Sequence, residues 1–279
     1  MLISKHLKFT RPTIKSIVSL TSTRTLATTT STHSKDHELA FLRDKYSTYS
    51  FKQINGLSRA ISNELLKQYK TDNLRGERIA VLCNNNYTYL TSIIGIWMAN
   101  GVPLCLNKQY PNNLIEYFMN DADCKLVING LDSHQPENGE LNALLAKLHV
   151  KNYKLVENTF HLTKDENNRA GNFSPKEELM SLNEMRSLMK RDPCKDSLII
   201  YTSGTTGKPK GVVLSFNNVT SLNETLIEAW SLTPQDCTLH VLPLNHVHGL
   251  LYALMTSFYN GSQVDMLPKF DAKVVWSKL

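Results

Sequence analysis

Short apolar runs alternate along most of this chain with longer segments in which apolar residues recur at helical spacing. A short apolar run bounded by turn residues is typical of a buried strand, and the helical spacing predicts an amphipathic helix. Strands that alternate with helices need crossover connections, which build a mainly parallel sheet. The pattern therefore predicts an α/β fold with layered, mainly parallel sheets and flanking helices.

The expected elements are bounded by residues that commonly begin or end helices. Gly101 follows one helical segment as a stop, and Pro111 opens another at a position where its missing N–H is not needed. Residues 132–195 are more polar, with helical patterns near 141–148 and 177–189, and we interpret them as a peripheral addition. The expected strands are 78–83, 102–106, 125–128, 198–201, 212–214, 238–242 and 264–267. The other expected helices are 51–65, 87–100, 111–119, 217–230, 248–259 and 272–279.

The net charge of +6 is concentrated at the N-terminus. Six of the 31 Lys and Arg residues lie in residues 1–35, which contain no Asp or Glu, and the remaining 25 equal the 25 acidic residues. Residues 36–279 are therefore neutral, which argues against a nucleic-acid-binding surface. Residues 1–35 are also rich in Ser and Thr, a composition typical of a mitochondrial transit peptide. We predict import into the mitochondrial matrix, with a disordered polar tail as the alternative.

Neither a membrane span nor a disulfide framework is indicated. The most apolar stretch, 90–106, is interrupted by Asn100, Gly101 and Pro103 and falls short of the roughly 18 residues that a spanning helix needs. The five cysteines are scattered and form no C-x-x-C pair, so we interpret them as small buried residues in a reducing compartment. We expect a leader at 1–35 and one folded region at 36–279. The sequence does not predict the oligomeric state.

Residues 201–211 read YTSGTTGKPKG and lie between two expected strands. Four hydroxyl donors occur within five residues, two glycines let backbone N–H groups turn toward one anion, and two lysines add positive charge. A polyphosphate needs many donors in a small volume, so this loop is expected to bind phosphates; an ordinary polar hairpin loop is the alternative. The expected phosphate-binding residues are Thr202, Ser203, Gly204, Thr205, Thr206, Gly207, Lys208 and Lys210.

The loop is not a Walker A motif. That motif requires Ser or Thr after its lysine, to bind Mg²⁺, whereas Pro209 follows Lys208 here. Proline has no hydroxyl and fits poorly inside the helix that a Walker A loop begins. The sequence therefore disfavours a P-loop NTPase.

The loop resembles the signature of the acyl-adenylate-forming superfamily, which includes acyl-CoA synthetases, luciferases and adenylation domains of peptide synthetases. The resemblance covers about residues 40–279 and includes GERIAVLCNNN at 76–86, NGVPLCLN at 100–107 and Tyr110-Pro111. It implies that the loop joins two strands and holds the β- and γ-phosphates of ATP while a carboxylate attacks the α-phosphate. It also implies that the loop's hydroxyl side chains and Lys210 contact the phosphates.

Three histidines, His240, His246 and His248, fall within the string LHVLPLNHVHG at 239–249. They are open to three interpretations: zinc ligands, buried core residues, or groups that hold an anion during its attack on phosphorus. Zinc is disfavoured because the string itself contains no thiol or acidic side chain and Pro243 interrupts the spacing of the histidines. The string is similar to that of malonyl-CoA synthetases, which implies that His246 lies by the acyl pocket. We expect His248 to bind a second carboxylate; a solvent-facing residue at a helix start is the alternative.

The resemblance implies a two-step reaction with ATP, Mg²⁺ and coenzyme A, with small molecules as the partners. The acid and ATP form an acyl-adenylate and pyrophosphate, and coenzyme A then displaces AMP to give a thioester. It also places the adenine-binding segment, the ribose-binding aspartate and the catalytic lysine beyond Leu279, so we expect this chain to be inactive alone. The alternatives are a medium- or long-chain fatty-acid CoA ligase and a non-catalytic nucleotide-binding fragment.

Overall fold

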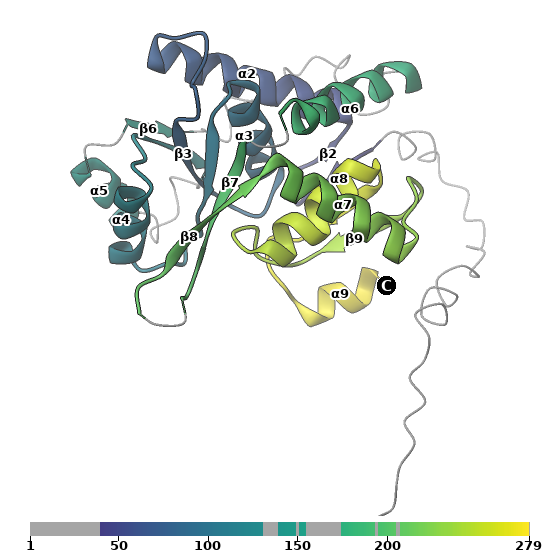
Figure 1. Cartoon of the computed structure of the whole chain (residues 1–279). Helices are drawn as coiled ribbons and strands as arrows, with labels where there is room; N and C mark the ends of the chain where they lie inside the picture. Colours follow the sequence, from purple (N-terminus) through teal and green to yellow (C-terminus); the bar gives the residue numbers. More distant parts are fainter. Residues whose placement is uncertain are drawn as a thin grey trace, which may run out of the picture. The chain divides into compact units, whose positions relative to one another are not determined.

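The computed structural model describes residues 40–130, 139–148, 151–154, 174–192, 195–204 and 207–278, all within one compact unit, Lys35–Leu279. The predicted leader at 1–35 lies outside these ranges, as do Thr205 and Thr206 of the predicted phosphate loop. The described chain forms two sheets with flanking helices, as the sequence pattern predicts (Figure 1).

The larger sheet has six strands in the order β6-β5-β3-β4-β7-β8. Neighbouring strands are parallel except for β7 and β8, which form an antiparallel pair. The inner strands are buried along almost their whole length, as expected of parallel strands covered on both faces. The strands are β3 (Arg78–Cys83), β4 (Val102–Cys105), β5 (Leu126–Gly130), β6 (Lys151–Lys154), β7 (Asp196–Thr202) and β8 (Lys210–Ser215).

The smaller sheet has four strands in the order β2-β1-β10-β9. Strand β10 is parallel to both of its neighbours, whereas β1 and β2 are antiparallel. The first described strand, β1, thus pairs with the last described strand, β10, so the two ends of the described chain meet in one sheet. The strands are β1 (Leu42–Arg43), β2 (Thr48–Tyr49), β9 (Cys237–His240) and β10 (Gln263–Met266).

Helices cover both faces of the larger sheet. Helices α4 (Asn112–Asp121) and α5 (Gly139–Lys147) pack on one face, in an apolar cluster that includes Leu82 and Leu104. A second cluster on the opposite face includes Ile79 and Val81 and extends to the smaller sheet. Its helices are α2 (Phe51–Tyr69), α3 (Tyr87–Met98), α6 (Pro175–Lys190), α7 (Phe216–Trp230), η3 (His248–Met255) and α8 (Thr256–Asn260).

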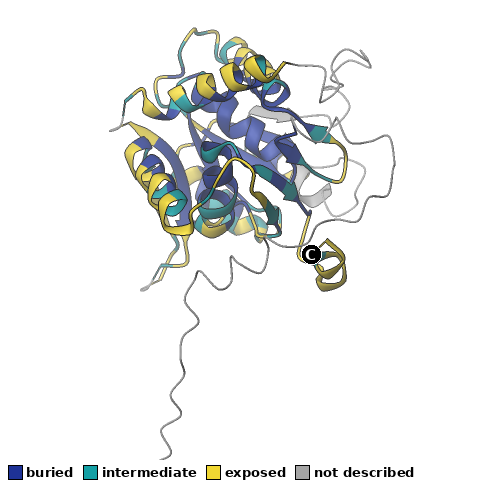
Figure 2. Cartoon of the chain, turned by 90° about the vertical axis from the view of Figure 1, so that its right-hand side faces the viewer, coloured by how far each residue is buried: buried dark blue, intermediate teal, exposed yellow. Residues whose placement is uncertain are grey.

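Helix α3 lies at the centre of the second cluster and is buried on nearly every side (Figure 2). A helix that is apolar all round is typical of such a position. Gly95 lets it approach α2 closely, because a Cβ there would lie 2.8 Å from the backbone oxygen of Ser58. The two helices therefore pack almost backbone to backbone.

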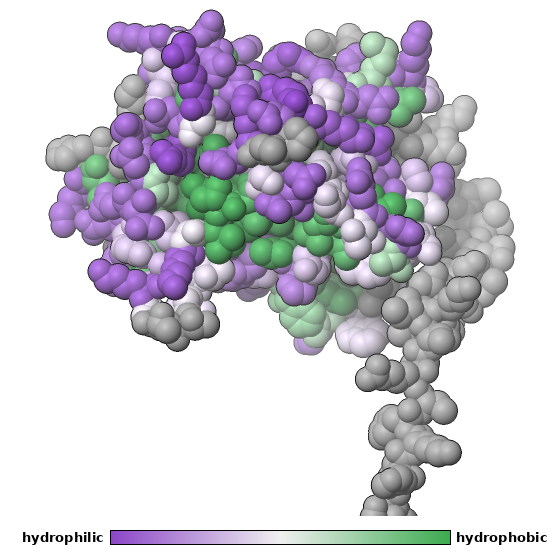
Figure 3. All heavy atoms as spheres, viewed as in Figure 1, coloured by the Kyte–Doolittle hydropathy of each residue, from purple (hydrophilic) through white to green (hydrophobic). Residues whose placement is uncertain are grey.

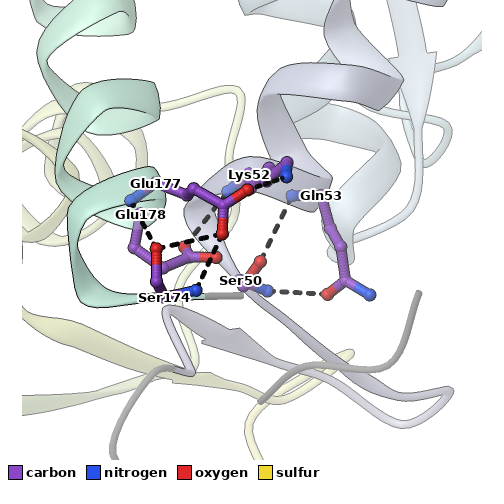
Figure 4. A network of polar contacts seen from close by, with 6 residues as sticks. All are labelled: Ser50, Lys52, Gln53, Ser174, Glu177 and Glu178. Carbon is purple, nitrogen blue, oxygen red and sulfur yellow. Dashed lines mark hydrogen bonds and ion pairs between the residues drawn. The ribbon is translucent and has the colours of Figure 1, made fainter. Parts of the chain in front are cut away.

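The N-termini of α2 and α6 meet and share hydrogen bonds (Figure 4). Each helix has its own capping box, begun by Ser50 in α2 and by Ser174 in α6. Across the junction, Lys52 Nζ lies 2.7 Å from Glu177 Oε1, and the Lys52 backbone N–H donates to Glu178 Oε2 at 3.1 Å. These contacts correct the interpretation of residues 132–195 as peripheral, because α6 packs into the core and β6 extends the larger sheet.

Three features of the C-terminal half are unusual: a π-helix, an exposed strand at the end of the sheet order, and a helix with no buried residue. Residues His248–Met255 form a π-helix where an α-helix was expected. Strand β8 ends the sheet order of the described strands and leaves Val212 and Val213 exposed. Figure 3 shows an apolar surface area over β8. Helix α9 (Ala272–Lys278) has no buried residue. In the residues that the structure describes, no helix is long and apolar enough to cross a membrane.

Candidate active site

The loops that follow parallel strands β3, β4 and β7 lie at one edge of the larger sheet, because the carboxyl ends of parallel strands share an edge. The corresponding loop of the smaller sheet reaches the same place: Asn85, after β3, donates from Nδ2 to the Leu242 carbonyl oxygen, after β9, at 2.8 Å. Open α/β sheets bind ligands at this edge. The carboxyl edge is therefore the candidate site.

The predicted phosphate loop connects β7 to β8 at this edge. The two strands pair up to Thr202 and Lys210, so the loop between them is held at both ends by the ladder. Gly204 and Gly207 have φ angles of +66° and +140°, in the region that favours glycine. A Cβ at Gly204 would lie 2.8 Å from the Lys208 carbonyl oxygen. Both glycines thus adopt backbone conformations that other residues disfavour.

Tyr201, at the base of the loop, is fixed by α4. Its hydroxyl donates to Asp121 Oδ2 at 2.5 Å, and its ring stacks on Phe118 with centroids 4.1 Å apart. Burial, followed by the bond to the Asp121 carboxylate, raises the pKa of Tyr201 far above its usual value, so the phenol keeps the donated proton. Gly211 faces this ring, where a Cβ would lie 3.1 Å from it.

A second tyrosine, Tyr117 of α4, supports the far side of the loop. The Tyr117 hydroxyl donates to the Pro209 carbonyl oxygen at 3.0 Å. The Lys208 ammonium lies 5.8 Å from the centroid of the Tyr117 ring, within cation–π range. Lys210 and the side chains of Thr202 and Ser203 are exposed. The loop therefore presents hydroxyl groups and positive charge to solvent from a fixed base.

The structure separates the three histidines of the sequence motif. His240 is buried at the end of β9, and its Nε2 lies 2.8 Å from the Gly249 carbonyl oxygen. Burial lowers the pKa of His240. His246 and His248 are exposed, and the His248 ring lies 4.6 Å from that of Tyr252. His240 is thus a core residue, while His246 and His248 remain accessible to a ligand.

Asn245, next to His246, joins the histidine segment to the loop after β4. Its Nδ2 lies 2.6 Å from the Tyr110 hydroxyl oxygen, and its Oδ1 accepts from Asn107 Nδ2 at 3.2 Å. The Tyr110 ring contacts Phe118 with centroids 5.4 Å apart, and Phe118 in turn stacks on Tyr201. A continuous set of contacts therefore connects the histidine segment to the base of the phosphate loop.

A cavity of about 300 Å³ opens at the carboxyl edge. A larger cavity of about 520 Å³ lies at the opposite edge, around Gly76, Gly101 and Asp196. We favour the smaller cavity as the ligand site because loops of both sheets converge there and because its charged lining residues, Lys108 and Lys269, are cations suited to anionic substrates. Its other lining residues are Cys83, Asn84, Asn85, Asn107, Gln109, Val241, Leu242, Pro243, Pro268 and Phe270.

Metal ligation by the histidines finds no support in the geometry. Across the described ranges, no group of three or more His, Cys, Asp or Glu side chains is arranged to hold a metal ion. Cys83, Cys105 and Cys124 are buried, as the sequence predicts, whereas Cys237 is exposed. Burial raises the pKa of the Cys105 thiol to about 12, so this thiol is not a nucleophile at neutral pH.

Sequence reasoning located the loop but missed the residues that support it. Tyr117 and Asp121 lie in no motif, and Tyr110 and Asn245 lie in quoted strings in which neither residue was given a role. The available signal was that Asn245 is adjacent to His246. A buried side-chain amide needs hydrogen-bond partners, and the partners of Asn245 lie far away in the sequence.

Most of this chain is similar to known proteins. The AMP-binding enzyme family model matches residues 28–279. The mitochondrial malonate–CoA ligase ACSF3 of Bos taurus is 32% identical over 240 residues, which cover 85% of this chain and 38% of the bovine protein. A malonate–CoA ligase of Arabidopsis thaliana is 32% identical over 244 residues, covering 83% of this chain and 38% of the plant protein.

Solved structures show the same fold. ATP-bound MatB from Rhodopseudomonas palustris superposes with a TM-score of 0.64 at 25% identity, covering 85% of this chain and 44% of MatB. O-succinylbenzoate coenzyme A synthetase (MenE) from Bacillus subtilis, in complex with AMP, gives a TM-score of 0.62 at 20% identity, covering 86% of this chain and 55% of MenE. The chain spans about 38% of the length of its curated relatives.

Proposed function

Because this chain belongs to the AMP-binding enzyme family, we propose that it contributes the phosphate- and carboxylate-binding part of an ATP-dependent acid–CoA ligase. The reaction converts a carboxylic acid to an acyl-adenylate and then to its CoA thioester. The observation that carries this proposal is the β7–β8 loop, which is tied to α4 through Tyr201 and Tyr117 and presents hydroxyls and lysines at the carboxyl edge.

The described ends of the loop support phosphate binding through their anchored positions and their charge together. Donors that are already oriented toward an anion bind it without first losing conformational freedom. Thr202, Ser203 and Lys210 extend from the ends of a paired ladder, and the Gly204 backbone leaves room for a close approach. We propose that this segment, together with Thr205, Thr206, Gly207 and Lys208, holds the terminal phosphates of ATP.

We propose malonate as the acid. The two exposed histidines, His246 and His248, lie two residues apart at the start of η3, and a dicarboxylate needs a second polar contact that a fatty acid does not. Two malonate–CoA ligases among the relatives, at 32% identity, support the same choice. Mg²⁺ would neutralise the phosphates and coenzyme A would accept the acyl group; the phosphate loop of this chain would serve the first step, in which the acyl-adenylate forms.

We propose that the protein is imported into mitochondria. The support is the acid-free, Ser/Thr-rich leader at 1–35, and the bovine relative is also named as mitochondrial. A fusion of residues 1–35 to a fluorescent protein should accumulate in mitochondria. The same fusion with Lys5, Lys8, Arg11 and Lys15 changed to Gln is the control, and mitochondrial accumulation of that control would contradict the proposal.

Ligand binding by the purified chain tests the proposed function. We expect ATP with Mg²⁺ to bind, and malonate to raise the melting temperature further in the presence of ATP, whereas octanoate has no such effect. A preference for octanoate would instead support the fatty-acid ligase. Failure to bind ATP would contradict the proposal altogether.

A further inference from the structure

The cavity of about 520 Å³ lies where strands β3, β4 and β7 begin. Of its lining residues, Gly76 lies just before β3, Val102 begins β4 and Asp196 begins β7. Cavities of this size commonly bind small organic molecules. The candidate active site lies at the carboxyl ends of the same strands, so this cavity is a separate space at the other edge of the larger sheet.

Two turns joined by a backbone hydrogen bond form one wall of this cavity. The Gly76 N–H donates to the Asn100 carbonyl oxygen at 2.8 Å. The Asn73 side chain holds the first turn, because its Oδ1 accepts from the Arg75 backbone N–H at 2.8 Å. All four residues line the cavity. The wall is therefore already ordered, and a ligand would bind without the cost of ordering it.

The buried part of the lining is apolar and consists of Trp97, Val102 and Phe216. The rings of Trp97 and Phe216 pack edge to face, with centroids 5.4 Å apart. Trp97 Nε1 also donates to the Ser197 carbonyl oxygen at 2.6 Å, which fixes the indole. This apolar floor suits the apolar body of a ligand.

Three cations, Arg75, Arg191 and Lys195, line the same cavity and are exposed. Among the described residues, no ion pair joins any of them to a carboxylate. The lining also includes Asp192 and Asp196, so it carries three positive charges against two negative ones. The excess positive charge favours an anionic ligand.

Arg191 connects this charge to the apolar floor. Its Nη2 donates to the Trp97 carbonyl oxygen at 2.6 Å. Partial burial lowers the pKa of Arg191, but a guanidinium remains charged at neutral pH. It has five N–H groups, and in the described part of the chain Trp97 is its only hydrogen-bond partner. The other N–H groups can therefore donate to a carboxylate or a phosphate.

We propose that the cavity at the amino ends of β3, β4 and β7 binds a small organic anion with a flat apolar body. The anionic group, a carboxylate or a phosphate, binds Arg191, and the apolar body lies against Trp97 and Phe216. Arg75 and Lys195 add positive charge. The ligand binds together with ATP and malonate, because it occupies the other edge of the sheet. The proposal does not depend on the proposed function.

The probe is 2-naphthoate, which joins a carboxylate to a flat apolar body, and its neutral analogue is 2-naphthamide. Calorimetric titration should show about tenfold tighter binding of 2-naphthoate. Saturating ATP and malonate should leave its affinity unchanged. Comparison with 2-naphthyl phosphate shows whether a carboxylate or a phosphate is preferred. No binding of 2-naphthoate and 2-naphthyl phosphate, equal affinity of 2-naphthoate and 2-naphthamide, or displacement by malonate would overturn the proposal.

The indole signal of Trp97 locates the bound probe. The double variant Trp230→Phe/Trp276→Phe replaces two exposed residues and leaves Trp97 as the only tryptophan. In ¹⁵N-labelled protein, 2-naphthoate should shift the single indole N–H signal. Binding of the probe without such a shift would place it elsewhere and contradict the proposal.

Charge removal tests the cations. Arg191→Gln should weaken 2-naphthoate binding about tenfold, and Lys195→Gln about threefold because its exposed charge acts from further away. Arg59→Gln removes the same charge at an exposed position of α2, and Lys269→Gln removes it at the carboxyl-edge cavity. Both controls should bind the probe normally.

Circular dichroism checks that each variant folds, and Lys195→Gln decides the matter if Arg191→Gln does not fold. Wild-type affinity for 2-naphthoate in the folded variants of Arg191 and Lys195 would overturn the proposal. A loss in Lys269→Gln as large as in Arg191→Gln would do so as well, because it would place the probe at the carboxyl edge.

Discussion

The Tyr201 hydroxyl donates to Asp121 Oδ2 at 2.5 Å and so joins the last turn of α4 to the strand that leads into the phosphate loop. The stacking of the same ring on Phe118 adds an apolar contact to the polar one. The loop is therefore positioned by a helix that begins some 90 residues earlier in the chain.

Removing the Tyr201 hydroxyl should loosen this junction without removing the stacked ring. Tyr201→Phe is expected to lower the free energy of unfolding by about 1 kcal/mol, at the low end for a bond to a charged group because Asp121 stays hydrated. Asp121→Asn keeps an acceptor and should cost less. Urea unfolding measures both; equal stability of Tyr201→Phe and the wild-type chain would contradict the role of this bond.

Gly204 should matter more for ATP than for folding. Its left-handed backbone and the nearby Lys208 carbonyl oxygen oppose a side chain, so Gly204→Ala should change the conformation of the loop. We expect ATP affinity to fall about tenfold, with a stability loss near 1 kcal/mol. Gly56→Ala is the matched control, because a Cβ at Gly56 meets no atom within 4 Å. It should leave ATP affinity unchanged in the same titration.

Gly249 should matter mainly for folding. A Cβ at this position would lie 2.2 Å from the Pro243 carbonyl oxygen. Because this oxygen belongs to the backbone, it cannot easily move away. Gly249→Ala is expected to lower the free energy of unfolding by about 3 kcal/mol, whereas Gly56→Ala should raise it by about 0.5–1 kcal/mol. Urea denaturation followed by circular dichroism compares the two. A Gly249→Ala variant as stable as wild type would show that the π-helix relaxes at no cost.

His240 should make the fold sensitive to mild acid. Burial lowers its folded-state pKa below the usual value of 6.5, so near that pH the unfolded chain binds a proton that the folded chain does not. Its contribution to stability is therefore fully present above pH 6.5 and is lost as the pH falls toward the folded-state pKa. His240→Gln keeps a donor for Gly249 but does not titrate, so its unfolding free energy should fall less between pH 7.5 and 5.5. An equal decrease in both proteins would assign the acid sensitivity to other groups.

The sequence predicted most elements because their local patterns were strong. The β7–β8 hairpin and its loop are contiguous, so residues 201–211 could be interpreted without knowledge of the fold. Strand β6 was missed because Lys151–Lys154 is polar and joins the sheet only through its neighbour β5. The π-helix was missed because Leu250, Leu251 and Leu254 suit an α-helix equally well.

The supports of the site could not be predicted in the same way. Asn245 and Tyr110 are 135 residues apart, and only the fold brings them together. The sequence did identify His246 and His248 as accessible candidates, but it could not separate them from the buried His240. That distinction depends on where β9 ends and on the position of η3. The Gly249 carbonyl oxygen of η3 contacts His240, the last residue of β9.

Binding of ATP to the β7–β8 loop is the central claim, and calorimetric titration tests it most directly. The wild-type chain, a Lys208→Gln/Lys210→Gln double variant and the Gly56→Ala control would each be titrated with ATP and Mg²⁺, and with adenosine. Phosphate binding by the loop predicts that ATP binds the wild type and the control more tightly than adenosine, and that the double variant loses about tenfold or more of its ATP affinity. ATP affinity in the double variant equal to that of the wild type would contradict it.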